Sequence, residues 1–122
     1  MNGEENRLLG RWGEALAADY LRKRGFHIQA AGWRCRFGEI DLIASDGVYL
    51  CFVEVKLRKN DCFAPARAFV NEAKQRRLRL SAELYLCENP DGLQPRFDVV
   101  EIYAPMGTKT HAPVINYLEN AF

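Results

Sequence analysis

The sequence has no long apolar run and no recognisable secretory signal. Its longest uninterrupted apolar stretch covers residues 48–53, whereas a membrane-spanning helix needs roughly 20 apolar residues. The N-terminus is polar and acidic at Glu4 and Glu5, without the basic start and apolar middle of a signal peptide. We therefore expect a cytoplasmic protein with no membrane partner.

Histidine is scarce, and neither the histidines nor the cysteines have partners at the spacing of a metal site. The four cysteines form no CxxC pair, and His27 and His111 stand alone, so the spacing of a zinc site and the pattern of a disulfide framework are both missing. No GxGxxG, GxxxxGK[ST] or GxSxG motif occurs. Dinucleotide-binding, P-loop and serine-hydrolase functions therefore have no support.

What is present is the composition of one soluble globular domain. The 122 residues are 48% hydrophobic and 27% charged, and this length suits a single domain over residues 1–122. The net charge is only +1, but residues 56–79 hold eight basic side chains against two acidic ones. This local excess suits phosphate binding, and it equally suits the solvated face of a helix.

The first elements are predicted from apolar spacing and glycine positions. Apolar residues recur at helical spacing over residues 5–24, and Gly25 stands where a helix C-cap belongs. A short strand is expected at residues 26–30, followed by a basic loop at residues 32–37.

A β-hairpin is the clearest prediction in the sequence. Strands are expected at residues 39–44 and 48–57, joined by a turn at Asp46 and Gly47, which is a strong short-range hairpin signature. The remaining expected elements are a loop at 61–65, a helix at 66–87, a turn at 89–92, a strand at 97–104, a loop at 105–113 and a final strand or helical piece at 114–122. This order predicts an α/β fold with a mixed sheet flanked by helices.

Two acidic side chains are expected to meet on this hairpin. Side chains alternate across a strand, so Glu39 and Asp41 share one face while Ile40 lies on the other. The two-residue turn would pair Asp41 with Phe52, which leaves Asp41 and Glu54 as diagonal neighbours about 7–8 Å apart between their Cα atoms. The hairpin therefore predicts two carboxylates close together on one face.

The charges of Glu54 and Lys56 interrupt an otherwise apolar strand. Buried charges are costly unless something pairs them, and a divalent cation relieves the repulsion between converging carboxylates. Mg²⁺ prefers carboxylate, water and phosphate oxygens. The predicted chemistry is phosphodiester hydrolysis at a bound metal, with Lys56 orienting water or stabilising charge. The alternative is a Glu54–Lys56 salt bridge on an edge strand.

The helices offer further candidates. Glu14 lies among small neighbours along the flank of the first apolar stripe and is a third possible ligand, although, taken alone, it is more simply explained as an exposed helix carboxylate. Asn71, Lys74 and Gln75 fall on the site's side of the second helix, or else belong to its ordinary surface. Asp98 is explained by a strand-end cap or by a salt bridge with Arg96.

The chain closely resembles a known bacterial family over almost its whole length. The resemblance rests on the motifs GEIDLIA at residues 38–44 and FVEVKLR at residues 52–58, together with Gly13-Glu14, Phe97-Asp98-Val99 and Asn120-Ala121-Phe122. On these motifs it resembles the YraN-like family of uncharacterised bacterial proteins. That family is similar to the PD-(D/E)xK, or restriction-endonuclease-like, superfamily and to archaeal Holliday-junction resolvases.

The resemblance implies both a fold and a set of roles. The fold is a three-layer α/β/α core around a mixed sheet, and the roles are metal ligands at Asp41, Glu54 and Glu14 with Lys56 as the catalytic lysine. Two positions depart from the expected pattern. Ile40 stands where the superfamily has proline, and Gly32 stands where many relatives are expected to have asparagine, but neither change touches the acids.

The leading hypothesis is a Mg²⁺- or Mn²⁺-dependent endonuclease acting on DNA, including branched DNA. The resolvase likeness also implies a homodimer, because cutting two strands symmetrically needs two sites. The side chains expected to contact nucleic acid are Arg34, Arg36, Arg58, Lys59, Lys74, Gln75 and Arg77. One alternative is a nucleic-acid-binding module that keeps the nuclease fold without cutting, and another is a structural protein whose acids and Lys56 form a closed ion-pair network.

Overall fold

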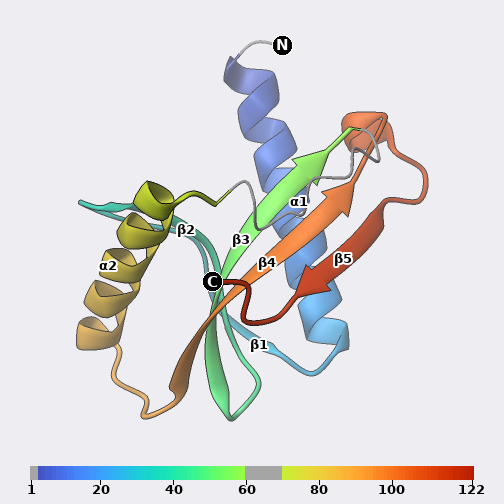
Figure 1. The fold of residues 1–122 in the computed structure, drawn as a ribbon. Helices are drawn as coiled ribbons and strands as arrows, with labels where there is room; N and C mark the ends of the chain where they lie inside the picture. Colours follow the sequence, from blue (N-terminus) through green and yellow to red (C-terminus); the bar gives the residue numbers. More distant parts are fainter. Residues whose placement is uncertain (1–2, 60–69) are drawn as a thin grey trace.

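A five-stranded mixed sheet carries one long helix on each face (Figure 1). This is a computed structural model, and it describes residues 3–59 and 70–122. The strands lie in the order β1-β2-β3-β4-β5, with β3 and β4 parallel and the other neighbours antiparallel. The elements are α1 (Gly3–Lys23), β1 (His27–Cys35), β2 (Gly38–Ser45), β3 (Tyr49–Arg58), α2 (Glu72–Glu88), β4 (Gln94–Tyr103), the 3₁₀ turn η2 (Gly107–Lys109) and β5 (Val114–Leu118).

The predicted α/β class and α/β/α layering are confirmed. Parallel strands need a crossover connection, and α2 lies on the chain between β3 and β4. Because helices cover both faces, the central strands are buried on both sides, and Leu50, Cys51, Phe52 and Val53 of β3 are at most 2% exposed. Within the described residues, no helix is long and apolar enough to cross a membrane.

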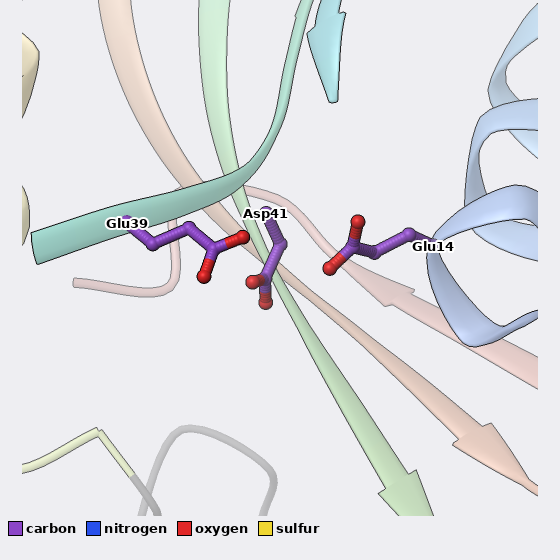
Figure 2. A group of neighbouring side chains, drawn as sticks. All are labelled: Glu14, Glu39 and Asp41. Carbon is purple, nitrogen blue, oxygen red and sulfur yellow. The ribbon is translucent and has the colours of Figure 1, made fainter. Parts of the chain in front are cut away.

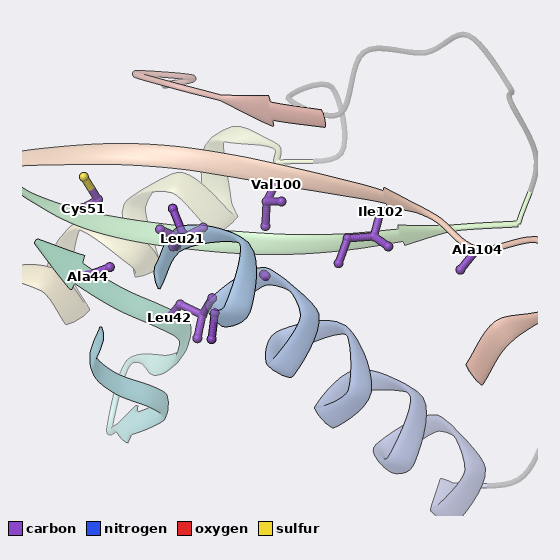
Figure 3. Packing of buried hydrophobic residues seen from close by; sticks show 10 residues of the cluster. Leu21, Leu42, Ala44, Cys51, Val100, Ile102 and Ala104 are labelled. Atoms are coloured by element: carbon purple, nitrogen blue, oxygen red, sulfur yellow. The ribbon is translucent and has the colours of Figure 1, made fainter. Parts of the chain in front are cut away.

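Helix α1 packs its small-residue stripe on the sheet. Ala17, Ala18 and Leu21 contact a buried cluster that includes Leu42 and Val100 (Figure 3). The predicted C-cap is present, since Gly25 has φ +89° and the N–H of the next residue, Phe26, donates to the Leu21 carbonyl at 3.0 Å. A positive φ is readily adopted by glycine, so Gly25 lets the chain leave the helix and enter β1.

Two glycines of α1 should respond oppositely to substitution. A Cβ on the buried Gly13 would lie 3.1 Å from the side chain of Leu57, whereas a Cβ on Gly10 would meet nothing within 4 Å. We expect Gly13→Val to lower the free energy of unfolding by about 1–3 kcal/mol through overpacking. Gly10→Ala should raise it by about 0.5–1 kcal/mol because alanine favours the helix. Urea denaturation of both variants tests this, and equal effects would contradict the close approach of α1 to β3.

Helix α2 covers the opposite face and begins later than predicted. Leu78, Ala82 and Tyr85 pack against a second buried cluster that includes Ile43 and Phe52. The expected start near residue 66 is wrong, because Asn71 is the N-cap and its side chain accepts from the Lys74 N–H at 2.9 Å. Asparagine is a strong N-cap residue. The expected loop at 61–65 and the first four residues expected in this helix lie outside the described part of the chain.

Strand β1 is longer than predicted and absorbs most of the expected basic loop. It pairs with β2 as far as Cys35 opposite Gly38, so residues 32–35 are strand and the turn holds only Arg36 and Phe37. The reason is long-range pairing, which overrides the loop-forming tendency of glycine and charged residues. Arg34 is therefore on a strand, and Gly32 interrupts that strand with φ +63°.

The hairpin register differs from the prediction by one residue on each strand. The turn lies at Gly47 and Val48, because the Asp46 carboxylate accepts from the N–H groups of Val48 at 2.9 Å and Tyr49 at 2.8 Å. Such a side-chain-closed turn is typical of aspartate. Ser45 then pairs with Leu50.

Extending this register places Asp41 opposite Glu54 rather than Phe52. The expected proximity of the two acids is kept, although they are cross-strand and not diagonal partners. The predicted face of Ile40 is wrong, since it packs in the α2-side cluster together with Ile43. Two-stranded ribbons twist strongly, and Figure 1 shows the β1–β2 end curving toward α2.

The buried carboxylate of Asp98 on β4 pairs with Arg96 on the same strand and links β4 to β5 and the residues that follow it. Asp98 is 0% exposed and accepts from Arg96 Nη2 at 2.9 Å, from Tyr117 Oη at 2.5 Å and from the Asn120 N–H at 2.8 Å. The predicted Arg96–Asp98 salt bridge is therefore confirmed. Buried charges persist only when paired and hydrogen-bonded, and this carboxylate meets both conditions.

Candidate metal centre

Three carboxylates converge where α1 lies beside the first half of β2. Glu14 comes from α1 and Glu39 and Asp41 from β2, and each offers an oxygen within 4.8 Å of the others. Figure 2 shows Glu14 reaching toward Asp41 from one side and Glu39 from the other. Carboxylate oxygens are hard ligands of the kind that Mg²⁺ and Mn²⁺ prefer, so the donor set fits such an ion.

Asp41 is held in place by the backbone of the neighbouring strand. The regular pairing of β2 with β3 ends at Leu42 opposite Val53. Just beyond it, the Val55 N–H donates to Asp41 Oδ2 at 2.8 Å. The Asp41 carboxylate therefore accepts the hydrogen bond that a backbone carbonyl of a paired strand would otherwise accept. This bond fixes the position of the carboxylate at the point where the two strands separate.

Gly32 leaves room for two of the acids to approach β1. A Cβ at this position would lie 3.1 Å from Glu39 Oε1 and 3.7 Å from Glu14 Oε1. Its φ of +63° is also one that most side chains avoid. The glycine that stands in place of the expected asparagine thus lies directly beside the carboxylates.

Glu39 is the member of this group to which the sequence analysis gave no role. Alternation along the strand had placed it on the face of Asp41, and that shared face was the available indication. Its approach to Glu14 depends on how α1 packs and on the local path of β1, and neither can be read from strand periodicity. By contrast, Glu14 and Asp41 come together as predicted.

The surroundings of these carboxylates disfavour negative charge. Burial, followed by the charge of Glu54, raises the pKa of Asp41 from 3.8 to about 7. Burial, followed by the charges of Glu39 and Glu54, also raises the pKa of Glu14. Both shifts have the sign expected for carboxylates that repel one another in a partly dry site. A bound cation would offset this repulsion.

Glu54 lies on the adjacent strand and is held by two lysines. It is 6% exposed, and its Oε1 lies 2.7 Å from Lys74 Nζ and 3.7 Å from Lys56 Nζ. Burial, and then the proximity of Lys74, lowers the pKa of Lys56. Burial opposes the charge on Lys74, but its hydrogen bond to Glu54 and the negative charges of Glu54 and Asp41 act together in the other direction and raise the pKa of Lys74.

The two groups of charged residues meet in one hollow. It has a volume of about 250 Å³, and Glu39, Asp41, Glu54, Lys74 and Arg77 are among the residues that line it. Asp41 and Glu54 thus face a shared space, as predicted. Glu54 lies outside the group whose oxygens are mutually within 4.8 Å, so its role as a ligand stays a prediction.

Some of the residues expected to contact nucleic acid lie beside the acids. Arg34 is 80% exposed in its side chain, with Nε 3.7 Å from Glu39 Oε2. Arg77 is exposed at the rim of the hollow. Lys74 instead binds Glu54, and Gln75 donates to the Val70 carbonyl at 2.9 Å.

The others lie further out or make internal contacts. Arg36 is exposed in the β1–β2 turn with its guanidinium 4.9 Å from the centre of the Phe37 ring. Lys59 is exposed at the end of the described β3 region. Arg58 forms a salt bridge with Glu101, and its side chain is only 12% exposed. Arg58 is therefore poorly presented to a phosphate in solution.

Comparison with known proteins agrees with the resemblance found in the sequence. The profile described as "Uncharacterised protein family UPF0102" matches residues 13–102. A UPF0102 protein of Nocardia farcinica is 44% identical over 120 residues, covering 97% of this chain and 91% of the relative. One from Acetivibrio thermocellus is 39% identical over 124 residues, covering 99% and 95%. The matched region contains all four acids and both lysines of the site.

Proposed function

Because the chain belongs to the uncharacterised protein family UPF0102, whose description assigns no activity, we propose its function from the site itself: a divalent-metal-dependent endonuclease that hydrolyses phosphodiester bonds of DNA. The observation that carries this proposal is the convergence of Glu14, Glu39 and Asp41 beside a Glu54–Lys56 pair on the next strand. Acids that cluster with a lysine at the end of a strand pairing suit metal-assisted hydrolysis.

Each acid has a part in this proposal. Asp41, Glu14 and Glu39 would bind Mg²⁺ or Mn²⁺. Glu54 on β3 would be a further ligand. When bound, the ion supplies an activated water and neutralises negative charge on the phosphate. The Val55 N–H keeps the Asp41 carboxylate in place, so this ligand needs little rearrangement.

The two lysines have different roles: Lys56 stabilises negative charge on a phosphate, and Lys74 orients Glu54. Lys56 is 24% exposed in its side chain, and its ammonium lies 3.7 Å from Glu54 Oε1. It would stabilise charge on a phosphate held at the acids. Lys74 lies 2.7 Å from Glu54 and holds that carboxylate in one orientation. Arg77 at the rim supplies a donor for a neighbouring phosphate.

The test is a cleavage assay on linear, flapped, four-way and single-stranded DNA, with RNA counterparts, in Mg²⁺ or Mn²⁺. We expect the parent protein to cut DNA and the Asp41→Ala/Glu54→Ala variant to lose this activity. Glu83→Ala, which removes an exposed acid on α2, is the matched control and should cut normally. Circular dichroism verifies folding. Cutting that persists in the double variant, or that needs no divalent ion, would contradict the proposal.

A second candidate function is a nucleic-acid-binding module that does not cut. The observation that favours it is the close Lys74–Glu54 pair, which neutralises one acid without a metal. This alternative expects the parent protein to bind nucleic acid, to cleave no substrate in the panel, and to bind equally well after Asp41 and Glu54 are removed.

A further inference from the structure

A second, larger hollow lies on the α1 side of the three carboxylates. Its volume is about 580 Å³, and three arginines line it: Arg7 and Arg11 from α1 and Arg34 from β1. Two of the carboxylates, Glu14 and Glu39, form its wall toward the candidate metal centre. The sequence analysis gave no role to Arg7 or Arg11.

The spacing along α1 places Arg7 and Arg11 on the same side of the helix as Glu14. Arg7 and Arg11 are four residues apart and Glu14 is three further on, which aligns all three along one side of the helix. Gly10 lies between the arginines, and a Cβ there would meet nothing within 4 Å. At Gly10 the helix backbone is therefore uncovered by any side chain and forms the floor of the hollow. The side chains of both arginines are exposed beside it.

The arginines are available to a ligand. Neither Arg7 nor Arg11 forms a salt bridge with another residue in the described part of the chain. Arg34 and Glu39 are paired at 3.7 Å, with side chains 80% and 39% exposed. Exposed pairs of this kind contribute little stability, so releasing Arg34 to a phosphate costs little.

We propose that this arginine-lined hollow binds the phosphate backbone of a nucleic-acid strand on the far side of the acids from Lys74 and Arg77. The inference rests on the proposed function. Glu39 lines both hollows, so the carboxylates stand between two basic surfaces. A nucleic-acid strand that runs across the acids would have its phosphates bound on both sides of them. The phosphodiester bond at the acids would then lie within the strand and not at its end. Arginine suits this task because its planar donors match phosphate oxygens.

The test measures binding without cleavage. Fluorescence anisotropy in EDTA is recorded for labelled single-stranded, duplex and four-way DNA from about 50 to about 200 mM KCl. For Arg7→Gln/Arg11→Gln we expect affinity to fall roughly tenfold or more for every substrate, and the salt slope to fall by about 1 for each arginine. Gly10→Phe keeps all charges but fills the hollow, and it should also weaken binding.

The control removes two positive charges from the other end of the same helix, in Arg22→Gln/Lys23→Gln, and should bind like the parent. The hollow is ruled out if Arg7→Gln/Arg11→Gln or Gly10→Phe binds as tightly as the parent, if the control loses as much affinity, or if the parent binds no nucleic acid. Mn²⁺ titration of the same variants separates this result from the proposed function. Intact Mn²⁺ binding with unchanged DNA affinity overturns the hollow alone, whereas absent Mn²⁺ binding in the parent overturns the metal centre.

Discussion

Asp41→Asn is expected to lower Mn²⁺ affinity by roughly 100-fold or more and to remove metal-dependent cleavage. Loss of a residue that only supports a metal ligand typically lowers metal affinity 10–100-fold. Asp41 is itself a proposed ligand and lies between Glu14 and Glu39 (Figure 2), so its loss should cost at least as much. Asparagine can still accept the Val55 N–H, which lies 2.8 Å from Asp41 Oδ2. Isothermal titration with Mn²⁺ and the cleavage panel measure the two effects, and a variant that binds Mn²⁺ like the parent would contradict the site.

The same substitution should change how stability depends on pH. The pKa of Asp41 in the folded, metal-free protein is raised from 3.8 to about 7, chiefly by burial and then by Glu54. Between these values the folded state holds a proton that the unfolded state releases, so stability falls as pH rises, by at most about 1.4 kcal/mol per pH unit. Asp41→Asn removes this slope. Metal-free Asp41→Asn should therefore be more stable than the parent at pH above 7.

Added Mn²⁺ should reverse that order. The ion stabilises the folded parent by binding to it, and it does so more strongly at alkaline pH because the carboxylates must lose their protons to act as ligands. Thermal denaturation of parent and variant at acidic and alkaline pH, with Mn²⁺ or EDTA, measures this. Glu83→Gln should behave like the parent throughout, because Glu83 is exposed on α2.

Asp98→Ala is expected to destabilise the fold by about 3–5 kcal/mol, because removing one partner of a buried ion pair leaves the other charge unpaired. Arg96 would keep a side chain only 10% exposed. The Tyr117 hydroxyl and the Asn120 N–H would also lose their acceptor. Urea denaturation gives the change in free energy, and a loss below about 1 kcal/mol would contradict this account.

The matched comparison for Asp98→Ala is an ion pair on the surface. Asp19 and Lys23 lie 3.2 Å apart with side chains 59% and 78% exposed, so Lys23→Ala should change stability by less than about 0.5 kcal/mol. Asp98→Asn, which keeps an acceptor for Tyr117 and Asn120, should fall between the two. If Asp98→Ala does not fold, the order of the other two variants still tests the argument.

The sequence by itself determined the first helix, the hairpin and the shared face of two of its acids. Helical spacing and Gly25 defined α1, and the period of two in a strand put Asp41 and Glu54 on one face of a hairpin. That conclusion survived the changed turn, because a register that moves by one residue on each strand leaves Asp41 and Glu54 on the same face. The motifs around these acids also indicated the family that the comparisons then showed.

Only the tertiary structure decided which charges meet. Glu39 joins Glu14 because α1 packs on the sheet and Gly32 leaves space beside both carboxylates. Glu54 meets Lys74, which is 20 positions further along the chain, on the helix α2 that forms part of the crossover between β3 and β4. Residues 32–35 became strand through pairing with β2. The physical reason is common to all three: periodicity reports which face a side chain occupies, whereas distances between elements depend on packing and long-range pairing that no local pattern encodes.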